Sequence, residues 1–472
     1  MAAFRATIVG PAFLQNVWPR APKHLHLAGR PRFAWVPILK LPRLIRVRPG
    51  VDTVKWDLAD IAYPGRYSSR GQGIMGSFID SSLSLLAKQT HPVISLAMGC
   101  PGPDAFPLED VRRITTEIME HEGPVALNYG PTEGDPLLRQ SLLEAEAEAT
   151  GLDIDPDCLI VTSGGMQGLD LVAKLLVNPG DPVVAELPSY SNGLATLHNY
   201  EGNVLQVSLD DQGLSVEECR RYFDRRGARP KLFYVIPNFQ NPSGITMSLR
   251  RRLELLDLAR SYEAIVLEDD PYGDLRFEGR ALPSLFALDE GKGTVIAVRT
   301  FSKTFSPGLR VGWILAPKNV VTKMIAAKQS MDTCTNVVGQ KIVAQLMAQG
   351  VMSRHILRLR HEYRQKRDLM LQALERHFGS LGGTSWTRPE GGFFLWMTFP
   401  EPTDAEKLFP VALEQGVAFI PGPAFTVQGG LRNAGRLCFT YPLLTEIDEA
   451  IRRLRYSYGL WASFGVEGAA AR

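Results

Sequence analysis

Short apolar runs alternate with helical patterns along the middle of the chain, from about residue 155 to about residue 330. The runs have the length of strands and lie between turn-forming residues. Between several of them lie segments of helical period, such as 166–177 and 248–263. This alternation predicts an α/β fold, with a large, mostly parallel sheet covered by helices on both faces. The predicted strands span 158–163, 182–187, 203–209, 231–237, 264–269, 294–300 and 311–316.

The pattern changes beyond this region. Residues 336–378 are strongly helical, and the apolar segments 391–399, 417–422 and 436–441 precede a final helical stretch, which predicts a smaller α+β domain. The resulting domain expectation is a basic, Pro-rich leader at 1–60, an N-terminal segment at 61–125 that packs with the small domain, a large domain at 126–335 and a C-terminal small domain at 336–472.

Composition mainly excludes classes of protein. Hydrophobic residues make up 45% and charged residues 22% of the chain, which is ordinary for a globular protein. No apolar run reaches the ~18 residues of a membrane span, so no membrane partner is expected. Lys and Arg number 52 against 50 Asp and Glu, which gives no reason to expect a nucleic-acid partner. The five cysteines are scattered without metal-ligand spacing, which predicts no metal site and a reducing compartment.

The N-terminus departs from this balance. Residues 1–51 carry nine basic side chains and no acidic one. An Arg-rich, acid-free N-terminus is typical of a mitochondrial transit peptide, but this one has no Ser and seven prolines, which suit an amphipathic targeting helix poorly. We therefore expect a flexible leader or a start codon assigned too early, and a cytoplasmic protein, with mitochondrial targeting as the alternative.

Candidate ligand-binding residues follow the predicted strands, because ligands of open α/β sheets bind beyond the carboxyl ends of the strands. Residues 164–168 place three glycines at a strand-to-helix turn, where backbone N–H groups can approach a phosphate. Such glycines commonly serve packing instead. The Asn241-Pro-Ser-Gly turn is equally ordinary by itself.

Two later positions are more specific. Asp269 and Asp270 end an apolar strand, where unpaired carboxylates are costly to bury, so either they meet solvent or one faces a cationic ligand. Lys303 follows the next strand between hydroxyl-bearing residues and precedes Arg310 by seven positions across a Pro-Gly turn. That combination is improbable for a simple surface lysine.

Taken together, the motifs resemble those of the class I and II aminotransferases, fold-type-I enzymes that use pyridoxal 5′-phosphate (PLP). The resemblance covers nearly all of residues 65–460 and is strongest to the multi-substrate branch that includes 2-aminoadipate and aromatic aminotransferases. The motifs are ALNYGPTEG (126–134), TSGGMQG (162–168), NPSG (241–244), EDDPY (268–272), Ser302-Lys303 through Arg310, and PEGGFFLW (389–396).

The resemblance implies roles for residues around the cofactor ring. Lys303 forms the internal aldimine with PLP and then moves a proton between Cα and C4′, which requires a lowered pKa. Asp269 pairs with the ring nitrogen, and the family spacing to Tyr272 selects it over Asp270. Tyr272 and Asn241 hydrogen-bond the 3′-oxygen of the ring.

The remaining implied roles concern the ring face, the phosphate and the substrate. Tyr190 stacks on the ring, Arg436 grips the substrate α-carboxylate bidentately with Asn241 and Gly99 nearby, and Tyr129 reaches the phosphate in the partner subunit of a homodimer. Relatives often have a hydroxyl and an amide side chain where this chain has Gly165 and Met166, so PLP should bind less tightly. The implied phosphate ligands are Arg310, the hydroxyls of Thr300 and Ser302, and the backbone amides of Gly165 and Met166.

The functional hypothesis is a ping-pong aminotransferase. An aromatic, aliphatic or 2-aminoadipate donor passes its amino group to a 2-oxo acid such as 2-oxoglutarate. An acidic donor side chain would need a cation in the N-terminal segment, where Arg70 is the obvious choice, so we favour an aromatic or aliphatic donor. The alternatives are a PLP-dependent decarboxylase or lyase of the same fold and an aminotransferase-like transcription regulator. Residues 71–76 fit the dinucleotide pattern G-x-G-x-x-G but lack a preceding strand, so we read them as a segment at the substrate entrance.

Overall fold

The computed structural model describes residues 65–76 and 88–470 of the 472-residue chain, with side chains up to residue 463. The described residues belong to one compact unit that begins at Tyr63. The leader expected at 1–60, with its targeting alternative, lies outside the described residues.

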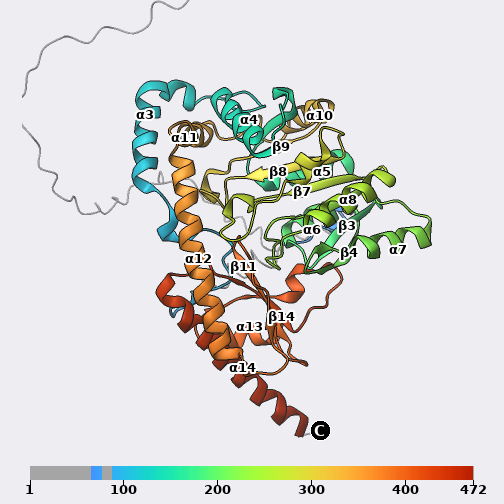
Figure 1. Ribbon diagram of the computed structural model, residues 1–472, viewed down its shortest axis with the longest axis vertical. Helices are drawn as coiled ribbons and strands as arrows, with labels where there is room; N and C mark the ends of the chain where they lie inside the picture. Colours follow the sequence, from blue (N-terminus) through green and yellow to red (C-terminus); the bar gives the residue numbers. More distant parts are fainter. Residues whose placement is uncertain (1–64, 77–87, 471–472) are drawn as a thin grey trace, which may run out of the picture. The chain divides into compact units, whose positions relative to one another are not determined.

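An eight-stranded sheet forms the larger part of the unit (Figure 1). The neighbours β4, β3, β6, β7 and β8 run parallel, whereas β9 is antiparallel to both β8 and β2, and β5 is antiparallel to β4. The spatial order is β2 (Leu159–Thr162), β9 (Gly312–Leu315), β8 (Val295–Thr300), β7 (Ile265–Asp269), β6 (Leu232–Val235), β3 (Pro182–Leu187), β4 (Asn203–Asp210) and β5 (Gly213–Leu214).

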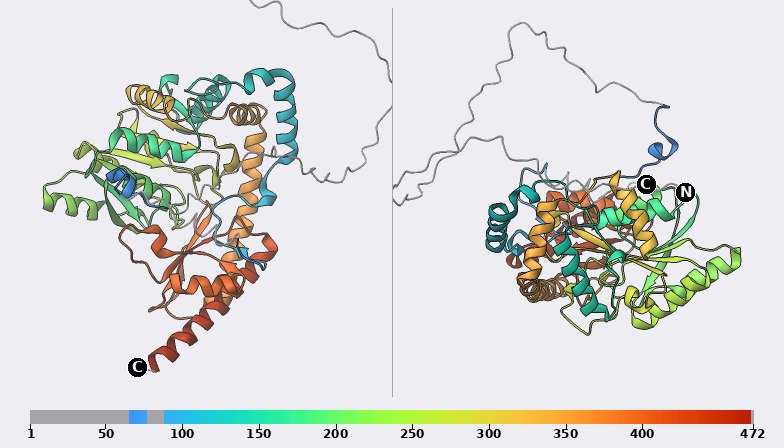
Figure 2. Two further views of the ribbon diagram at one scale, coloured as in Figure 1. Left: turned by 180° about the vertical axis from the view of Figure 1, so that it is seen from behind. Right: turned by 90° about the horizontal axis from the view of Figure 1, so that it is seen from above.

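Helices cover both faces of this sheet, as the views from front and behind show (Figures 1 and 2). Helices α5, α6 and α10 pack with alternate strand residues in one apolar cluster, and α7 and α8 pack in another on the opposite face. Helices α3, α4 and α11 enclose a third cluster around β2, β8 and β9. The bounds are α3 (Leu108–Ala126), α4 (Pro136–Thr150), α5 (Gly165–Leu176), α6 (Ser191–Asn199), α7 (Val216–Arg226), α8 (Leu249–Ser261), α9 (Leu285–Asp289), α10 (Lys318–Gln329) and α11 (Val337–Ala348).

Strand alternation decides which side chains meet above the sheet. Leu267 on β7 belongs to the cluster under α5 and α6, and Val266 belongs to the opposite one. Asp269 therefore shares the α5–α6 face with Leu267, because side chains two positions apart on a strand point the same way. Tyr234 on β6 pairs in register with Leu267 and lies on that face too.

A four-stranded antiparallel sheet and three helices form the smaller part of the fold. Helix α14 packs against both α12 and α13. A separate two-stranded pairing joins β1 to β12, whereas α3 packs on α11. The elements are β10 (Ser385–Trp386), β11 (Phe394–Thr398), β14 (Ala434–Cys438), β13 (Ile420–Pro421), β1 (Ile94–Ser95), β12 (Val417–Ala418), α12 (Val351–Phe378), α13 (Ala405–Glu414) and α14 (Ile447–Ala470).

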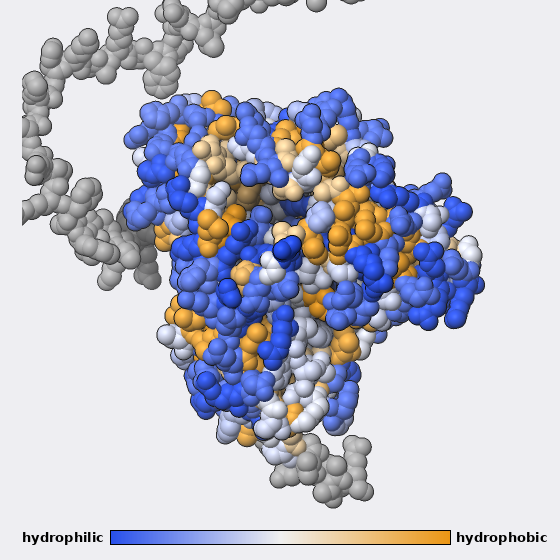
Figure 3. Space-filling view, viewed as in Figure 1, coloured by the Kyte–Doolittle hydropathy of each residue, from blue (hydrophilic) through white to orange (hydrophobic). Residues whose placement is uncertain are grey.

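The surface seen in Figure 3 is mainly hydrophilic, with separate apolar patches among the polar side chains. The strands beneath are fully covered: every residue of β2, β6 and β8 is buried. No helix in the described part of the chain combines the length and the apolar character that a membrane crossing requires.

The predicted fold class is confirmed: a mostly parallel sheet between helices is joined to a smaller antiparallel sheet. All seven strands predicted between residues 158 and 316 are present, with ends that differ by at most a few residues. The pairs β1–β12 and β4–β5 and the strand β10 were missed. β12 lies within the predicted segment 417–422, whereas β1, β5 and β10 have two residues each, too few for a period-2 pattern to stand out.

Candidate active site

The turn between β2 and α5 brings a cation and backbone donors together. Gly164 has φ +77°, and a Cβ there would lie 2.5 Å from Nη2 of Arg310, so this turn requires glycine. Arg310 donates from Nη2 to the carbonyl oxygen of Ser163 at 3.2 Å. A guanidinium beside the amide-bearing start of a helix suits a phosphate dianion.

Two hydroxyls adjoin this turn from the end of β8. Thr300 and Ser302 are buried, and the Thr300 hydroxyl donates to Oγ of Ser302 at 2.9 Å. A Cβ on Gly165 would lie 3.6 Å from Cβ of Thr300, so the two segments are in contact. On the other side, the Tyr190 hydroxyl lies 3.6 Å from Sδ of Met166. The structure thus gathers all of the predicted phosphate residues and Tyr190 in one place.

Asp332 supports the turn from outside the predicted motifs. Its Oδ2 accepts from the Ser163 hydroxyl at 2.7 Å and from Nε2 of Gln167 at 2.8 Å, and its Oδ1 accepts from the buried Lys328 at 2.6 Å. Desolvation opposes ionisation of Asp332, but these hydrogen bonds outweigh it and lower its pKa. The spacing of Lys328 and Asp332 could have indicated an ion pair, but no sequence signal links Asp332 to Ser163.

Asp269 ends β7 and is buried. Its Oδ2 accepts a hydrogen bond from the Tyr234 hydroxyl at 2.9 Å. Desolvation raises the pKa of Asp269 to about 7, the Tyr234 hydrogen bond lowers it, and the neighbouring Asp270 raises it. A carboxylate in this environment is stabilised by a cationic partner, as the charged nitrogen of a ligand would be.

Asp270 has a different task. Its carboxylate accepts from Nδ2 of Asn238 at 2.8 Å and from the backbone N–H of Gly273 at 2.9 Å, so it closes the loop that follows β7. That loop carries Tyr272, which is buried against the rings of Phe393 and Phe394. Of the two adjacent acids, Asp270 is therefore used to close its own loop, and Asp269 is the one left to face a cationic ligand.

Lys303 follows β8 of the large sheet and contacts residues near strands of the smaller part of the fold. Its Nζ donates to the carbonyl oxygen of Gly99 at 2.6 Å and lies 5.8 Å from the ring centre of Phe393. Desolvation lowers the pKa of Lys303, and the positive charge of Arg436 lowers it further. An amine whose protonated form is disfavoured can act as a nucleophile and base near neutral pH.

Arg436 on β14 is almost completely buried and sits next to the same segment. It donates from Nη1 to Oδ1 of Asn241 at 3.0 Å and from Nη2 to the carbonyl oxygen of Ala97 at 2.7 Å. Its guanidinium lies 4.2 Å from the ring centre of Phe394. Among the described residues Nε of Arg436 has no hydrogen-bond partner, and no carboxylate forms an ion pair with the guanidinium. A bound carboxylate would supply both.

Glu186, near the carboxyl end of β3, is a further residue that the motifs did not single out. It is fully buried and accepts hydrogen bonds from the backbone N–H of Ile236 and from Nε2 of Gln240, each at 3.1 Å. Desolvation raises its pKa to about 8, against the effect of these two donors. Gln240 precedes Asn241, so Glu186 anchors the loop that carries Asn241.

Two predicted residues lie away from this cluster. Tyr129 is 81% exposed on the surface of the unit. Arg70, in α1 (Ser69–Gln72), pairs with Glu201 at 3.6 Å and lies over the ring of Tyr200 at the far end of α6 from Tyr190. Gly71 lies in this short helix, Gly73 and Gly76 follow it, and no strand precedes them in the described residues, which agrees with rejecting a dinucleotide motif.

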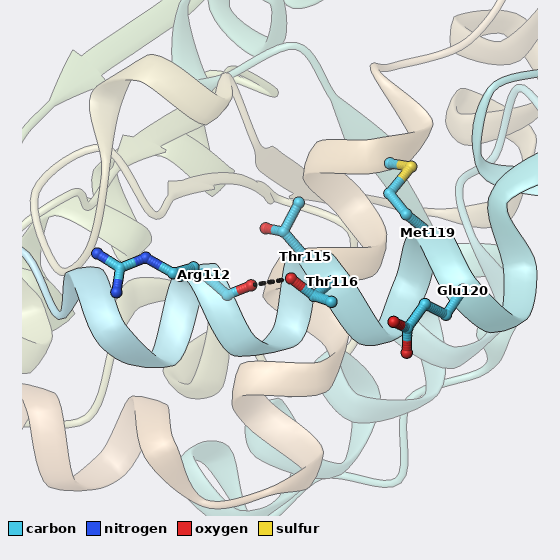
Figure 4. A pocket seen from close by; sticks show the side chains of 5 residues that line it. All are labelled: Arg112, Thr115, Thr116, Met119 and Glu120. Carbon is cyan, nitrogen blue, oxygen red and sulfur yellow. Dashed lines mark hydrogen bonds between the residues drawn. The ribbon is translucent and has the colours of Figure 1, made fainter. Parts of the chain in front are cut away.

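The outer face of α3 carries a shallow depression lined by Arg112, Thr115, Thr116, Met119 and Glu120 (Figure 4). All five residues come from one helix, and the hydroxyl of Thr116 bonds the carbonyl oxygen of Arg112, as in many helices. No polar groups converge on this depression from other elements, so it lacks the features of a catalytic site.

The cluster around Lys303 fits PLP on its own geometry. The turn at Gly164, where a side chain would collide with Arg310, leaves room for a phosphate group. Asp269 is a buried acid that a cationic ring nitrogen would stabilise. Nε of Arg436 has no hydrogen-bond acceptor among the described residues, and a carboxylate would provide one. Lys303 connects these three features: it follows Ser302 at the phosphate turn, its charge acts on Asp269, and it contacts the segment around Gly99 that Arg436 also contacts.

Comparison with known proteins gives the same assignment. Residues 92–454 match the family aminotransferase class I and II. The chain is 40% identical over 403 residues to an aromatic-amino-acid aminotransferase of Thermococcus litoralis, covering 85% of this chain and 95% of the relative. The kynurenine aminotransferase of Pyrococcus horikoshii, solved with PMP, is 40% identical with a TM-score of 0.78, covering 83% of this chain and 96% of that one.

A third relative is the α-aminoadipate aminotransferase of Thermus thermophilus, solved with N-(5′-phosphopyridoxyl)-L-leucine. It is 35% identical with a TM-score of 0.78, and the alignment covers 85% of this chain and all of that one. The range matched by the family, 92–454, extends over most of the described structure and spans the positions of the predicted cofactor residues. The chain therefore belongs to the class I and II aminotransferases and is a PLP-dependent transaminase.

Proposed function

We propose that this enzyme transfers the amino group of an aromatic, aliphatic or 2-aminoadipate donor to a 2-oxo acid such as 2-oxoglutarate by a ping-pong mechanism. The observation that carries the proposal is the convergence of Lys303 and Arg436 on Gly99. Lys303 presents an amine of lowered pKa, and Arg436 presents a buried guanidinium without an anionic partner among the described residues. An α-amino acid carries the two groups that complete this pair.

Bound PLP supplies an electron-withdrawing ring that makes the Cα proton of an amino acid acidic. In this proposal Lys303 holds the cofactor and then carries the proton at its Nζ, and Arg436 fixes the α-carboxylate so that the Cα–H bond faces that amine. Asp269 faces the ring nitrogen, and Tyr272 and Asn241 donate to the 3′-oxygen. The Asn241 amide is suited to this role, because Arg436 already occupies its oxygen and leaves the NH₂ group to donate.

The phosphate group would lie at the start of α5. Its proposed ligands are the guanidinium of Arg310, the hydroxyls of Thr300 and Ser302 and the backbone amides of Gly165 and Met166, with Tyr190 against the ring face. The contacts among these groups support the assignment. Since positions 165 and 166 carry no side-chain donor, binding rests on Arg310, the two hydroxyls and the backbone.

The donor is proposed to be aromatic or aliphatic rather than acidic. Relatives named for aromatic amino acids, kynurenine and α-aminoadipate all resemble this chain, so the family alone does not choose. Arg70, the cation that would serve an acidic side chain, pairs with Glu201 and lies over Tyr200 instead. Phe394 and Phe425 flank the guanidinium of Arg436, which favours an apolar side chain beside the carboxylate.

The proposed assembly is a homodimer in which Tyr129 reaches the phosphate of the partner subunit. Its exposed ring supports this, and so does the exposure of Val125 and Leu127 at the end of α3 that precedes it, since neighbouring exposed apolar side chains often mark interfaces. Sedimentation of the holoenzyme tests the dimer, and Tyr129→Phe should raise the Kd for PLP only if the partner contact exists.

We also propose a cytoplasmic location and the domain limits 61–125, 126–335 and 336–472.

A single-turnover experiment tests the reaction. Each of a panel of amino acids is mixed with holoenzyme in the absence of any acceptor. We expect one equivalent of 2-oxo acid per site and the return of the starting absorbance when 2-oxoglutarate is added. Release of CO₂ or ammonia instead would identify a decarboxylase or lyase. A panel in which 2-aminoadipate is by far the best donor would overturn the preference for apolar donors.

A further inference from the structure

Behind the proposed cofactor ring, Tyr234 and Asp269 form a buried pair that the catalytic motifs do not include. Tyr234 lies in the centre of β6 and is fully buried, and Asp269 ends the adjacent strand β7. The register pairs Tyr234 with Leu267, two residues before Asp269, so both side chains stand on the same face of the sheet. The Tyr234 hydroxyl donates to Oδ2 of Asp269 at 2.9 Å.

We propose that Tyr234 is a positioning residue for transamination, whose hydroxyl orients the Asp269 carboxylate and keeps it anionic toward the cofactor nitrogen. The inference rests on the proposed role of Asp269 and adds a residue to it. One carboxylate oxygen is occupied by Tyr234, which leaves Oδ1 for the ring. Tyr234 can only donate here, because burial and the adjacent carboxylate raise its own pKa well above the ordinary value.

The hydroxyl is held in place by the start of α6. A Cβ on Gly193 would lie 2.4 Å from Oη of Tyr234, so α6 approaches the hydroxyl as closely as a glycine permits. Gly193 lies three residues after Tyr190, the residue proposed to stack on the ring. The α6 backbone thus fixes Tyr234 relative to the cofactor ring, and a side chain at 193 would disturb both tyrosines.

The electrostatics of the pocket explain why such a donor is needed. The charge of Asp270 opposes the ionisation of Asp269, whereas Arg299 and Lys303 favour it, and Glu186, Tyr190 and Tyr272 complete the surroundings. Desolvation raises the pKa of Asp269 to about 7, and the Tyr234 hydrogen bond is the largest effect in the opposite direction. Without that bond, the proton shared between the carboxyl group and the ring nitrogen moves toward the carboxyl group.

The experiment uses Tyr234→Phe and Asp269→Asn in the holoenzyme, with Tyr363→Phe as the matched control. Tyr363 is another buried tyrosine, but its hydroxyl has no partner among the described residues, so its removal breaks no hydrogen bond. Each protein is loaded with PLP labelled with ¹⁵N in the ring, and the ¹⁵N chemical shift is recorded at pH 7. The rate and the KM of the donor half-reaction are measured in parallel.

We expect the wild-type nitrogen to be protonated and the Tyr234→Phe signal to move toward the unprotonated value, in the direction of Asp269→Asn but less far. The rate of the donor half-reaction should fall about tenfold with little change in KM, since a hydrogen bond to a charged group is lost and no substrate contact is. Tyr363→Phe should match wild type in both readouts, and Gly193→Ala should follow Tyr234→Phe.

The possible failures are distinguishable. If Asp269→Asn changes the signal and the rate while Tyr234→Phe changes neither, the role of Tyr234 is wrong and that of Asp269 stands. If Asp269→Asn changes neither, the assignment of Asp269 fails and this inference fails with it. If Tyr234→Phe slows the reaction but leaves the nitrogen signal in place, Tyr234 serves packing alone, and the inference is overturned.

Discussion

Arg436 donates a hydrogen bond from Nη1 to the side-chain oxygen of Asn241 at 3.0 Å. The two residues lie 195 positions apart in the chain, one on the small antiparallel sheet and the other in the loop after β6. The bond couples the proposed carboxylate-binding group to the proposed partner of the cofactor 3′-oxygen. In this assignment Arg436 binds the substrate directly and reaches the cofactor only through Asn241. A substitution at position 436 should therefore affect substrate binding far more than cofactor binding.

Arg436→Lys tests this coupling. An ammonium cannot bind a carboxylate bidentately and cannot keep both the Asn241 and the Ala97 contacts, so the KM for the amino acid should rise about a hundredfold. The Kd for PLP should change less than about twofold, because Arg436 does not serve the phosphate. Arg432→Lys is the control: Arg432 is exposed and pairs with Asp404, and its replacement should leave both constants unchanged. A weaker PLP complex without a change in KM would contradict the assignment.

The turn at Gly164 and Gly165 predicts opposite outcomes at adjacent positions. Gly164→Ala places a Cβ 2.5 Å from the Arg310 guanidinium at a φ of +77°, so Arg310 must move and the Kd for PLP should rise at least about tenfold. Gly165→Ser has room, since the nearest atom to a Cβ there is 3.6 Å away, and it adds a hydroxyl donor at the start of α5.

Titration of apoenzyme with PLP, followed by protein fluorescence, measures both constants. Gly165→Ser should lower the Kd several-fold, which would show that the missing side-chain donors weaken binding in the wild type. An unchanged or higher Kd for Gly165→Ser would mean that the backbone amides and Arg310 already satisfy the phosphate.

The positions at and after the ends of the strands singled out candidate residues, and the family resemblance was needed to give them roles. Lys303, Asp269 and Asn241 each follow an apolar strand, and parallel strands bring such positions to one edge of a sheet. The supporting residues could not be found in this way. Ser163 and Asp332 lie 169 positions apart, and Tyr234 has the pattern of an ordinary core residue of β6. Their partners depend on the packing of helices and on strand order, which the linear pattern does not encode.

Asp332→Asn should weaken both the fold and the cofactor complex. Lys328 is fully buried and would lose the charge that neutralises it. The single amide oxygen left at position 332 can accept either from Lys328 or from Ser163 and Gln167, so one side of the cluster loses its acceptor. Because Asp332 is about a quarter exposed, we expect a loss of about 2 kcal/mol in the free energy of unfolding rather than the full cost of a buried charge.

The control is Asp157→Asn, which breaks the exposed pair with Lys318. Solvent screens that pair, so urea unfolding should detect less than about 0.5 kcal/mol. Equal losses for the two variants would show that the Asp332 cluster is not a structural anchor. A Kd for PLP equal to that of the wild type in Asp332→Asn would show that Asp332 stabilises the fold but does not shape the phosphate turn.

Glu186 predicts a pH dependence of stability. In the unfolded chain a glutamate loses its proton near pH 4.3, but burial raises the pKa of Glu186 in the fold to about 8. Between these values the unfolded state has released a proton that the native state retains, so the contribution of Glu186 to stability is fully present below about pH 4 and is lost as pH rises to about 8. Glu186→Gln keeps a side-chain oxygen that can accept from Ile236 and has no proton to lose.

Urea unfolding of the apoenzyme at pH 6 and pH 9 measures the difference. Relative to the variant, the wild type should lose on the order of 2 kcal/mol between these pH values, since each pKa unit of difference corresponds to about 1.4 kcal/mol. Glu217→Gln, on the exposed face of α7, should behave as the wild type does. A wild-type protein that gains stability relative to Glu186→Gln at pH 9 would mean that Glu186 is ionised in the fold, with its charge held by the donors of Gln240 and Ile236.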